Sequence, residues 1–148
     1  MGRMAGLRNY LRLILRLSLA GVFVVAALPK LQDPVGFAVS ITGYRVVGTT
    51  TAAWLALILP WLELVCGIGL LIPWLRRGSA LILSCLLTLF VGLHLSVVAR
   101  GLSIDCGCFA FAEATPVHPS IVILRTVLLL IASLYLLWSD GGERGTRP

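Results

Sequence analysis

Four long stretches of the chain are predominantly hydrophobic, and short segments that contain most of the prolines and charges separate them. A helix needs about 20 residues to cross the ~30 Å hydrocarbon core of a bilayer. We therefore predict an all-α membrane protein with four transmembrane helices, at about residues 10–28, 52–72, 79–99 and 120–138. The connections leave no room for a soluble domain. We expect one domain over residues 1–148, arranged as an antiparallel bundle.

The amino-acid composition is that of a membrane protein. The residues are 59% hydrophobic and only 12% charged, whereas soluble domains carry about 25% charged residues. These values exclude a disordered chain, a basic nucleic-acid-binding domain and an ordinary cytosolic enzyme. The first stretch has the basic start of a secretory signal, but no small-x-small cleavage site precedes Pro29 and its apolar run is long. We therefore expect an anchored helix there.

The basic residues predict how the chain is oriented. Cytoplasmic segments of membrane proteins carry an excess of lysine and arginine. We expect both termini in the cytoplasm of an inner-membrane protein, with residues 29–51 and 100–119 facing outward into a periplasm or its equivalent. The net charge of +6 is attributed to this bias. The inner side holds Arg3, Arg8, Arg12, Arg16, Arg76, Arg77, Arg144 and Arg147, and the outer side holds Lys30, Arg45, Arg100 and Arg125.

The segment after the first stretch predicts a short interfacial helix. Asp33 followed by Pro34 is a helix-start signal, with a capping carboxylate and a proline at the first helical position. Phe37, Ile41 and Tyr44 then share one face at helical spacing. Such a helix lies in the membrane interface or packs as a lid over the bundle.

The second outer segment contains the residues with the clearest chemistry. Cys106 and Cys108 lie on the predicted oxidising side of the membrane, where disulfides form and persist. A disulfide between them closes a tight, strained ring, for which Gly107 supplies backbone freedom. Strain makes a disulfide easier to reduce, and closing so small a loop adds little stability. The pair therefore favours redox exchange over a structural role.

Neighbouring residues bear on the reactivity of this pair. Arg100 would stabilise a thiolate and lower its pKa, whereas Asp105 would act in the opposite direction. Three other interpretations stay open: a structural disulfide, two unpaired thiols, and a metal site built from Cys106, Cys108 and His118. One residue between the cysteines is tighter than the usual zinc spacing, so no metal is predicted.

Polar residues inside the predicted spans form a second candidate site, because an ionisable group in hydrocarbon is costly and usually functional. Glu63 lies near the middle of the second span. His94 and Arg125 lie about six residues, or roughly 9 Å, inside the outer ends of the third and fourth. One interpretation is a buried Glu63–Arg125 ion pair. The other is a polar pocket that holds a quinone headgroup or relays protons, with His94 as the proton carrier. Cys66 and Cys85 are expected to act as small hydrophobic residues.

The sequence around the paired cysteines resembles a known family. Residues 100–109, Arg-Gly-Leu-Ser-Ile-Asp-Cys-Gly-Cys-Phe, are similar to the signature of the methylamine utilisation protein MauE family, which belongs to the DoxX-like four-helix membrane proteins. Two positions depart from the family pattern: Ala110 stands in place of a glycine, and Thr126 in place of an acidic or amide residue. Weaker matches between about residues 17 and 135 are Lys30-Leu31, Asp33-Pro34, Phe37, Tyr44, Leu59-Pro60, Glu63-Leu64, Gly67 and Leu124-Arg125.

The resemblance implies a role in protein maturation. The family is associated with processing of the disulfide-rich methylamine dehydrogenase light subunit, and a thioredoxin-like partner is typical of that system. We therefore expect a membrane thiol–disulfide relay in which Cys106 and Cys108 exchange with a periplasmic partner or client. No cofactor is assigned, although a quinone between the helices would accept electrons, by analogy with other four-helix oxidoreductases. The alternatives are a non-catalytic scaffold for a periplasmic redox partner and a small-molecule transport subunit. We expect no nucleic-acid partner.

Overall fold

Five helices make up the described part of the chain. The computed structural model describes residues 2–100 and 119–141, and these contain no β-strand. The prediction of an all-α protein is confirmed for them. The helices are α1 (Gly2–Gln32), α2 (Pro34–Gly43), α3 (Thr49–Gly69), α4 (Arg76–Ala99) and α5 (Pro119–Gly141).

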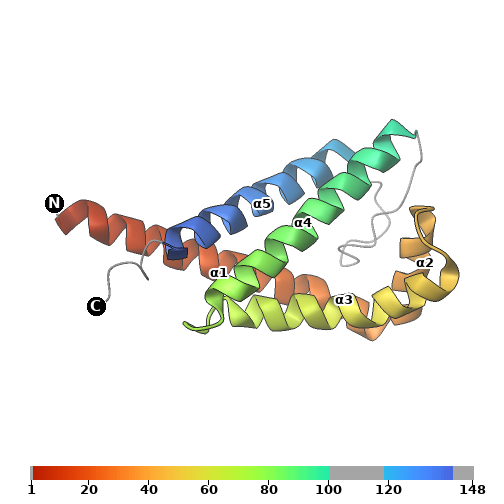
Figure 1. Ribbon diagram of the computed structural model, residues 1–148, viewed down its shortest axis with the longest axis horizontal. Helices are drawn as coiled ribbons and strands as arrows, with labels where there is room; N and C mark the ends of the chain where they lie inside the picture. Colours follow the sequence, from red (N-terminus) through yellow and green to blue (C-terminus); the bar gives the residue numbers. More distant parts are fainter. Residues whose placement is uncertain (1, 101–118, 142–148) are drawn as a thin grey trace.

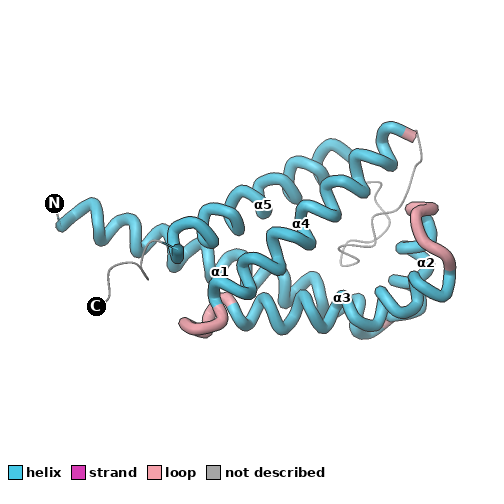
Figure 2. The backbone as a smooth tube through the Cα atoms, in the orientation of Figure 1, coloured by secondary structure: helices cyan, strands magenta, loops and turns pink. Residues whose placement is uncertain are grey.

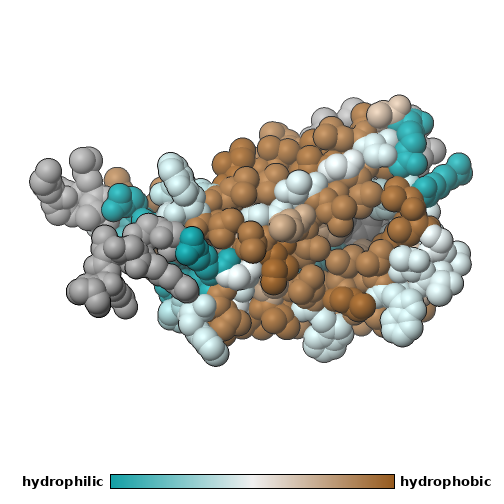
Figure 3. Space-filling model, in the orientation of Figure 1, coloured by the Kyte–Doolittle hydropathy of each residue, from teal (hydrophilic) through white to brown (hydrophobic). Residues whose placement is uncertain are grey.

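Four of the described helices are long and apolar enough to cross a membrane. They are Gly6–Gln32 of α1, the whole of α3 and α4, and Ile121–Ser139 of α5. Each overlaps one of the four predicted spans. Figure 3 shows that hydrophobic residues cover most of the middle of the visible face, while hydrophilic residues gather toward its two ends. The chain is a multi-pass membrane protein.

The long helices pack in pairs. α1 lies against α3, and α4 lies against α5, as the ribbon in Figure 1 shows. α2 packs on α3 at one end of the molecule, which we call the α2 end. The tube in Figure 2 shows the short α3–α4 turn at the opposite end, near the last turn of α5. We call this the turn end.

Small residues let α1 and α3 approach closely. Ala20 on α1 and Ala52 and Ala56 on α3 are all buried. A Cβ atom at Gly67 would lie only 3.3 Å from the Phe23 Cβ and 3.4 Å from the Ala20 carbonyl oxygen. Helices in lipid gain stability from such close packing, because lipid provides no hydrophobic driving force for their association.

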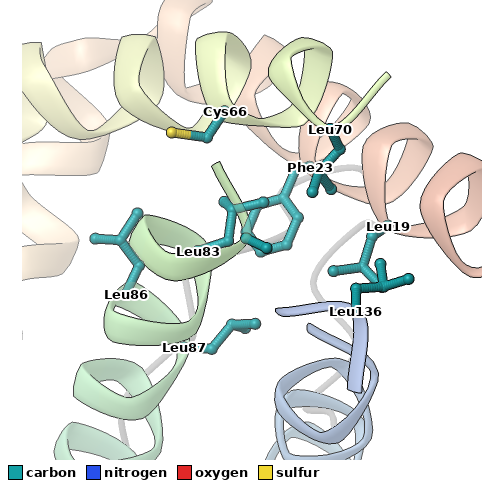
Figure 4. Packing of buried hydrophobic residues seen from close by; sticks show 9 residues of the cluster. Leu19, Phe23, Cys66, Leu70, Leu83, Leu86, Leu87 and Leu136 are labelled. Carbon is teal, nitrogen blue, oxygen red and sulfur yellow. The ribbon is translucent and has the colours of Figure 1, made fainter. Parts of the chain in front are cut away.

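A hydrophobic core joins the two helix pairs. Figure 4 shows Leu19 and Phe23 of α1 directed toward Leu83 and Leu87 of α4, with Leu136 of α5 alongside. All five are buried. The core therefore draws on both pairs and fixes their relative position.

A small group of polar contacts links α4 to α5 within the apolar interior. The Ser84 and Ser133 hydroxyl oxygens lie 2.8 Å apart, and the Ala80 carbonyl oxygen lies 2.7 Å from the first and 3.1 Å from the second. Each hydroxyl carries one proton, so two of the three contacts are hydrogen-bonded at a time. Interhelical hydrogen bonds in membranes contribute about 0.6–1.7 kcal/mol each.

The predicted short helix is present as α2. The Asp33 Oδ1 atom accepts a hydrogen bond from the Gly36 N–H at 2.8 Å, and Pro34 occupies the first turn. Gly36 suits this cap because a Cβ there would collide with the Asp33 carboxylate. Phe37 and Tyr44, from the predicted apolar face, are buried. α2 therefore packs onto the long helices through the face that the sequence predicted.

Candidate functional site

Lys30 and Glu63 form an ion pair buried between α1 and α3. The Lys30 Nζ atom donates to Glu63 Oε1 at 2.8 Å and to Oε2 at 2.7 Å. The two side chains are only 4% and 2% exposed. A charge without a partner is costly in the interior of a membrane protein, so each side chain provides the charge that the other needs.

The position of Lys30 follows from the repeat of buried residues along α1. Phe23, Ala26 and Lys30 succeed one another at spacings of three and four residues, and all are buried. α1 continues through Pro29, whose carbonyl oxygen accepts a hydrogen bond from the Asp33 N–H at 3.0 Å. The helix therefore extends past the predicted end of the first span and carries Lys30 into the bundle. Sequence reasoning assigned Lys30 to the outer segment, although the three-four spacing was a usable signal.

The partner of Glu63 in the structure is Lys30, whereas an ion pair with Arg125 was one of two interpretations of the sequence. Both Glu63 oxygens accept hydrogen bonds from Lys30. The reason lies in the order of packing: α3 packs directly against α1, whereas α5, which carries Arg125, packs against α4 and α1.

Two aromatic rings enclose the Lys30 ammonium group. Its Nζ atom lies 5.1 Å from the centre of the Phe37 ring, on α2, and 5.8 Å from the centre of the Phe90 ring, on α4. Ring faces attract cations, and the attraction strengthens where water is excluded. Side chains from four elements, α1 to α4, therefore converge on this ion pair.

His94 lies on α4, one turn beyond Phe90. Its Nδ1 atom is 2.7 Å from the Phe90 carbonyl oxygen. A carbonyl oxygen only accepts hydrogen bonds, so Nδ1 carries the proton, and in neutral His94 the ring lone pair is on Nε2. The His94 ring also meets the Tyr44 ring edge to face, with centres 5.9 Å apart and an interplanar angle of 74°.

Arg100 ties the end of α4 to the end of α2. Its Nη2 atom donates to the Tyr44 carbonyl oxygen at 3.0 Å, and its Nε atom donates to the Ser96 carbonyl oxygen at 3.1 Å. Arg45, directly after Tyr44, adopts a left-handed conformation with a φ of 52°. Beside the role toward a thiolate that the sequence predicts, Arg100 therefore fixes the helix end from which the cysteine-containing segment continues.

A small cavity, which we call the chamber, brings the predicted intramembrane residues together. Its polar lining is Lys30, Glu63, His94, Arg125 and Thr126, and apolar side chains of α1, α4 and α5 complete its wall. Four of these polar residues are buried, while much of Arg125 is exposed. Glu63, His94 and Arg125, which the sequence singled out separately, thus share one cavity.

The volume of the chamber decides what it can hold. It measures about 40 Å³. A buried water needs at least about 10–15 Å³ and two to four polar partners, whereas pockets for drug-sized ligands begin near roughly 300 Å³. In this conformation the chamber therefore has room for a few water molecules.

The residues of the predicted redox pair lie outside the described part of the chain. The helix ends that flank them, the last turn of α4 and the first turn of α5, lie away from the turn end in Figure 1. Of the other cysteines, Cys66 packs in the hydrophobic core as predicted, whereas Cys85 is exposed on α4. The predicted site residues outside the described ranges are Asp105, Cys106, Gly107 and Cys108, together with His118 of the metal alternative.

Comparison with known proteins identifies the family. The family model described as methylamine utilisation protein MauE matches residues 8–139. The chain belongs to the MauE family. It is 36% identical to the MauE protein of Methylophilus methylotrophus over 121 residues, which is 81% of this chain and 64% of that protein. It is 34% identical to the MauE protein of Paracoccus denitrificans over 119 residues, 80% of this chain and again 64% of that protein.

The MauE-family relatives differ from this chain in length. The chain spans 64% of the two MauE proteins above. Protein TlpB of Flavobacterium psychrophilum is 30% identical over 137 residues, which cover 86% of this chain but only 36% of TlpB. A region similar to most of this chain is therefore part of a much longer protein in that organism. No solved structure matches the chain at a significant level.

Proposed function

We propose that this MauE-family chain is the membrane component of a periplasmic thiol–disulfide relay, in which Cys106 and Cys108 alternate between dithiol and disulfide. The relay matures a disulfide-containing client, such as the methylamine dehydrogenase light subunit. Support comes from the family, whose members above are named for methylamine utilisation. Further support comes from the Cys-Gly-Cys sequence itself, because a disulfide between cysteines one residue apart would close a tight, strained ring, and strain favours exchange over a structural role.

The observation that carries the proposal is the anchor formed by Arg100. It is the last described residue before the cysteine segment, and its guanidinium group holds the Tyr44 carbonyl oxygen. A reactive pair works best when rigid elements fix its support. The anchor gives the helix end that precedes the cysteine segment the fixed support that the proposed exchange requires.

The proposed exchange balances within the chain and its client. A client thiolate attacks one sulfur of the Cys106–Cys108 disulfide, the S–S bond breaks, and the other sulfur leaves with the electron pair. A second client thiolate then displaces the mixed disulfide. The client gains a disulfide, and Cys106 and Cys108 become a dithiol. Reoxidation transfers two electrons and two protons to an acceptor, which we propose is the disulfide of a thioredoxin-like protein or a membrane quinone.

A quinone acceptor would bind outside the chamber in the observed conformation. The chamber measures about 40 Å³, far less than a pocket for an organic ligand. The headgroup would therefore approach from the α2 end or from the lipid. The same small volume argues against a transport path through the chamber. The ion pair is a second argument, because Lys30 occupies both carboxylate oxygens of Glu63.

The proposed arrangement in the membrane follows the charges. We propose an antiparallel, DoxX-like bundle in the cytoplasmic membrane, with the turn end in the cytoplasm and the α2 end in the periplasm. Arg76 and Arg77 begin α4 at the turn end, as the excess of basic residues in cytoplasmic loops favours. A redox partner then docks at the α2 end. The match to part of the longer TlpB is consistent with a membrane unit that works together with further protein domains.

Client maturation tests the proposal. In cells that lack the native gene, Cys106→Ser/Cys108→Ser should abolish formation of client disulfides, while the matched Cys66→Ala/Cys85→Ala variant should support it as well as the wild type. Client maturation that persists in the serine variant but fails without the protein would replace the relay with a scaffold. Maturation that requires Glu63 but neither outer cysteine would indicate transport.

A further inference from the structure

The turn end presents two exposed tryptophans at the ends of spanning helices. Trp74 lies in the α3–α4 turn and Trp138 lies in the last turn of α5, and their side chains are 78% and 84% exposed. Figure 2 shows that this turn and this end of α5 lie near each other. Tryptophan is enriched at the headgroup level of a bilayer, because its ring is amphipathic. The two rings therefore mark the depth at which lipid headgroups meet the turn end.

Arg76 and Arg77 lie at the same depth as these rings. They are the first two residues of α4, which is long and apolar enough to span the membrane from Arg76 onward. The Arg77 side chain is exposed, and the Arg76 Nε atom is buried without a hydrogen-bond partner among the described residues. A guanidinium group has five N–H donors and binds two phosphate oxygens at once. Both arginines are thus placed to bind a phosphate group at the membrane boundary.

The described side chains supply no negative charge at the turn end. Asp33 and Glu63 are the acidic residues whose side chains the structure describes, but Asp33 caps α2 and Glu63 binds Lys30. The first turn of α4 contains no acidic residue, so the positive end of its helix dipole adds to the arginine charges. The same half of α1 contributes further basic residues at four-residue spacing, namely Arg8, Arg12 and Arg16. The turn end therefore attracts anions.

We infer that Arg76 and Arg77 bind the headgroup phosphate of an anionic phospholipid beside Trp74. The depth of the arginines selects a lipid over other anions, because headgroup phosphates are concentrated at the boundary where α4 begins. Basic residues next to spanning helices attract anionic lipids in this way. The excess of arginine in cytoplasmic loops acts during insertion and requires only the charge, so it does not assign a contact to the folded side chains. The site is separate from the chamber and independent of the proposed relay.

Fluorescence quenching by brominated lipids tests the site in the full chain reconstituted into vesicles. The chain has four tryptophans, so replacing Trp54, Trp61 and Trp138 with phenylalanine leaves Trp74 as the reporter. Brominated phosphatidylglycerol should quench Trp74 with an apparent affinity about 30-fold above that of brominated phosphatidylcholine, the equivalent of two arginines at about 1 kcal/mol each. The matched reporter retains only Trp54, in the second turn of α3 at the α2 end, where we expect no such preference. Equal affinities of the two lipids at Trp74, or the same preference at Trp54, would overturn the inference without any change at the arginines.

Charge variants in the Trp74 background test whether the arginines cause the preference. Arg77→Gln should lower the preference about fivefold, whereas Arg45→Gln, at an exposed arginine of the α2 end, should leave it unchanged. Arg76→Gln/Arg77→Gln should make the two lipids nearly equal, and a preference that persists in this double variant would contradict the site. Inorganic phosphate should weaken the preference no more than chloride at the same ionic strength. A specific effect of phosphate would mean that the arginines bind free anions, which would overturn the lipid site.

Discussion

The Nζ atom of Lys30 donates to both carboxylate oxygens of Glu63, 33 positions further along the chain. This ion pair joins α1 to α3 among apolar residues, and the Phe37 and Phe90 rings flank its ammonium group. It makes one wall of the chamber that also contains His94. The pair therefore connects the packing of the bundle with its polar site.

Removing one member of the pair should cost more than removing both. Lys30→Met should lower the free energy of unfolding by about 3–5 kcal/mol, because a buried carboxylate loses its compensating charge. Lys30→Met/Glu63→Met should recover most of that loss, since a buried pair replaced by apolar residues is often neutral. Denaturant unfolding in micelles measures both, with the exposed Val39→Met as a control. A double variant as unstable as the single one would show that the pair is not held by mutual charge compensation.

Gly67 should tolerate no large side chain. A Cβ at this position would already press on Phe23 and Ala20, so Gly67→Leu should separate α1 from α3 and lower the free energy of unfolding by about 1–3 kcal/mol. A Cβ atom at Gly78 would have no other atom within 4 Å. Gly78→Leu is therefore the matched control in the same unfolding assay. Equal stability of the two leucine variants would contradict the close approach of α1 and α3.

A comparison of variants at Arg100 and Arg45 distinguishes the effect of the Arg100 anchor from the effect of positive charge. Both belong to the α2 end, but Arg100 holds the Tyr44 carbonyl oxygen, whereas Arg45 is exposed. Arg100→Gln should slow exchange at Cys106 and Cys108 about tenfold, the effect of roughly 1.4 kcal/mol, and Arg45→Gln should leave the rate near that of wild type. Stopped-flow exchange with a model dithiol gives the two rates. Equal slowing in both variants would assign the effect to net charge instead.

The proposed orientation predicts the behaviour of fusion reporters. A fluorescent protein that matures only in the cytoplasm should be active when fused after Pro148, and alkaline phosphatase at the same position should be inactive. Phosphatase inserted after Gly48, in the predicted outer segment, should be active. The opposite pattern would place the cysteine segment in the cytoplasm and remove the oxidising setting that the relay needs.

The long helices were predictable because the membrane constrains them strongly. A stretch of about 20 apolar residues has few alternatives to a spanning helix, and all four predicted spans overlap described helices. The Asp33-Pro34 start of α2 was equally readable, because capping depends on local chemistry. The exact ends were not, since the first span was predicted to end at Leu28, whereas α1 continues through Pro29 to Gln32.

The contacts between the site residues were harder to predict than the residues themselves. Glu63, His94 and Arg125 stood out because ionisable groups are rare in hydrocarbon, and all three line the chamber. The partner of Glu63 depends on which helices are neighbours, and an apolar pattern does not encode that order. Lys30 was assigned to an outer segment because the first span was predicted to end at Leu28, although Lys30 lies inside the bundle. The contact of Arg100 with Tyr44 is likewise a long-range one that spacing along the chain does not reveal.

The redox state of Cys106 and Cys108 in native membranes distinguishes a thiol–disulfide relay from a scaffold. Thiols are trapped with a maleimide after equilibration in glutathione buffers, and single-cysteine variants are used to capture mixed disulfides. We predict that the pair titrates well above about −300 mV, the potential below which structural disulfides lie, and that a periplasmic protein is trapped with it. A pair that resists reduction throughout the titration, or thiols that never oxidise, would contradict the relay.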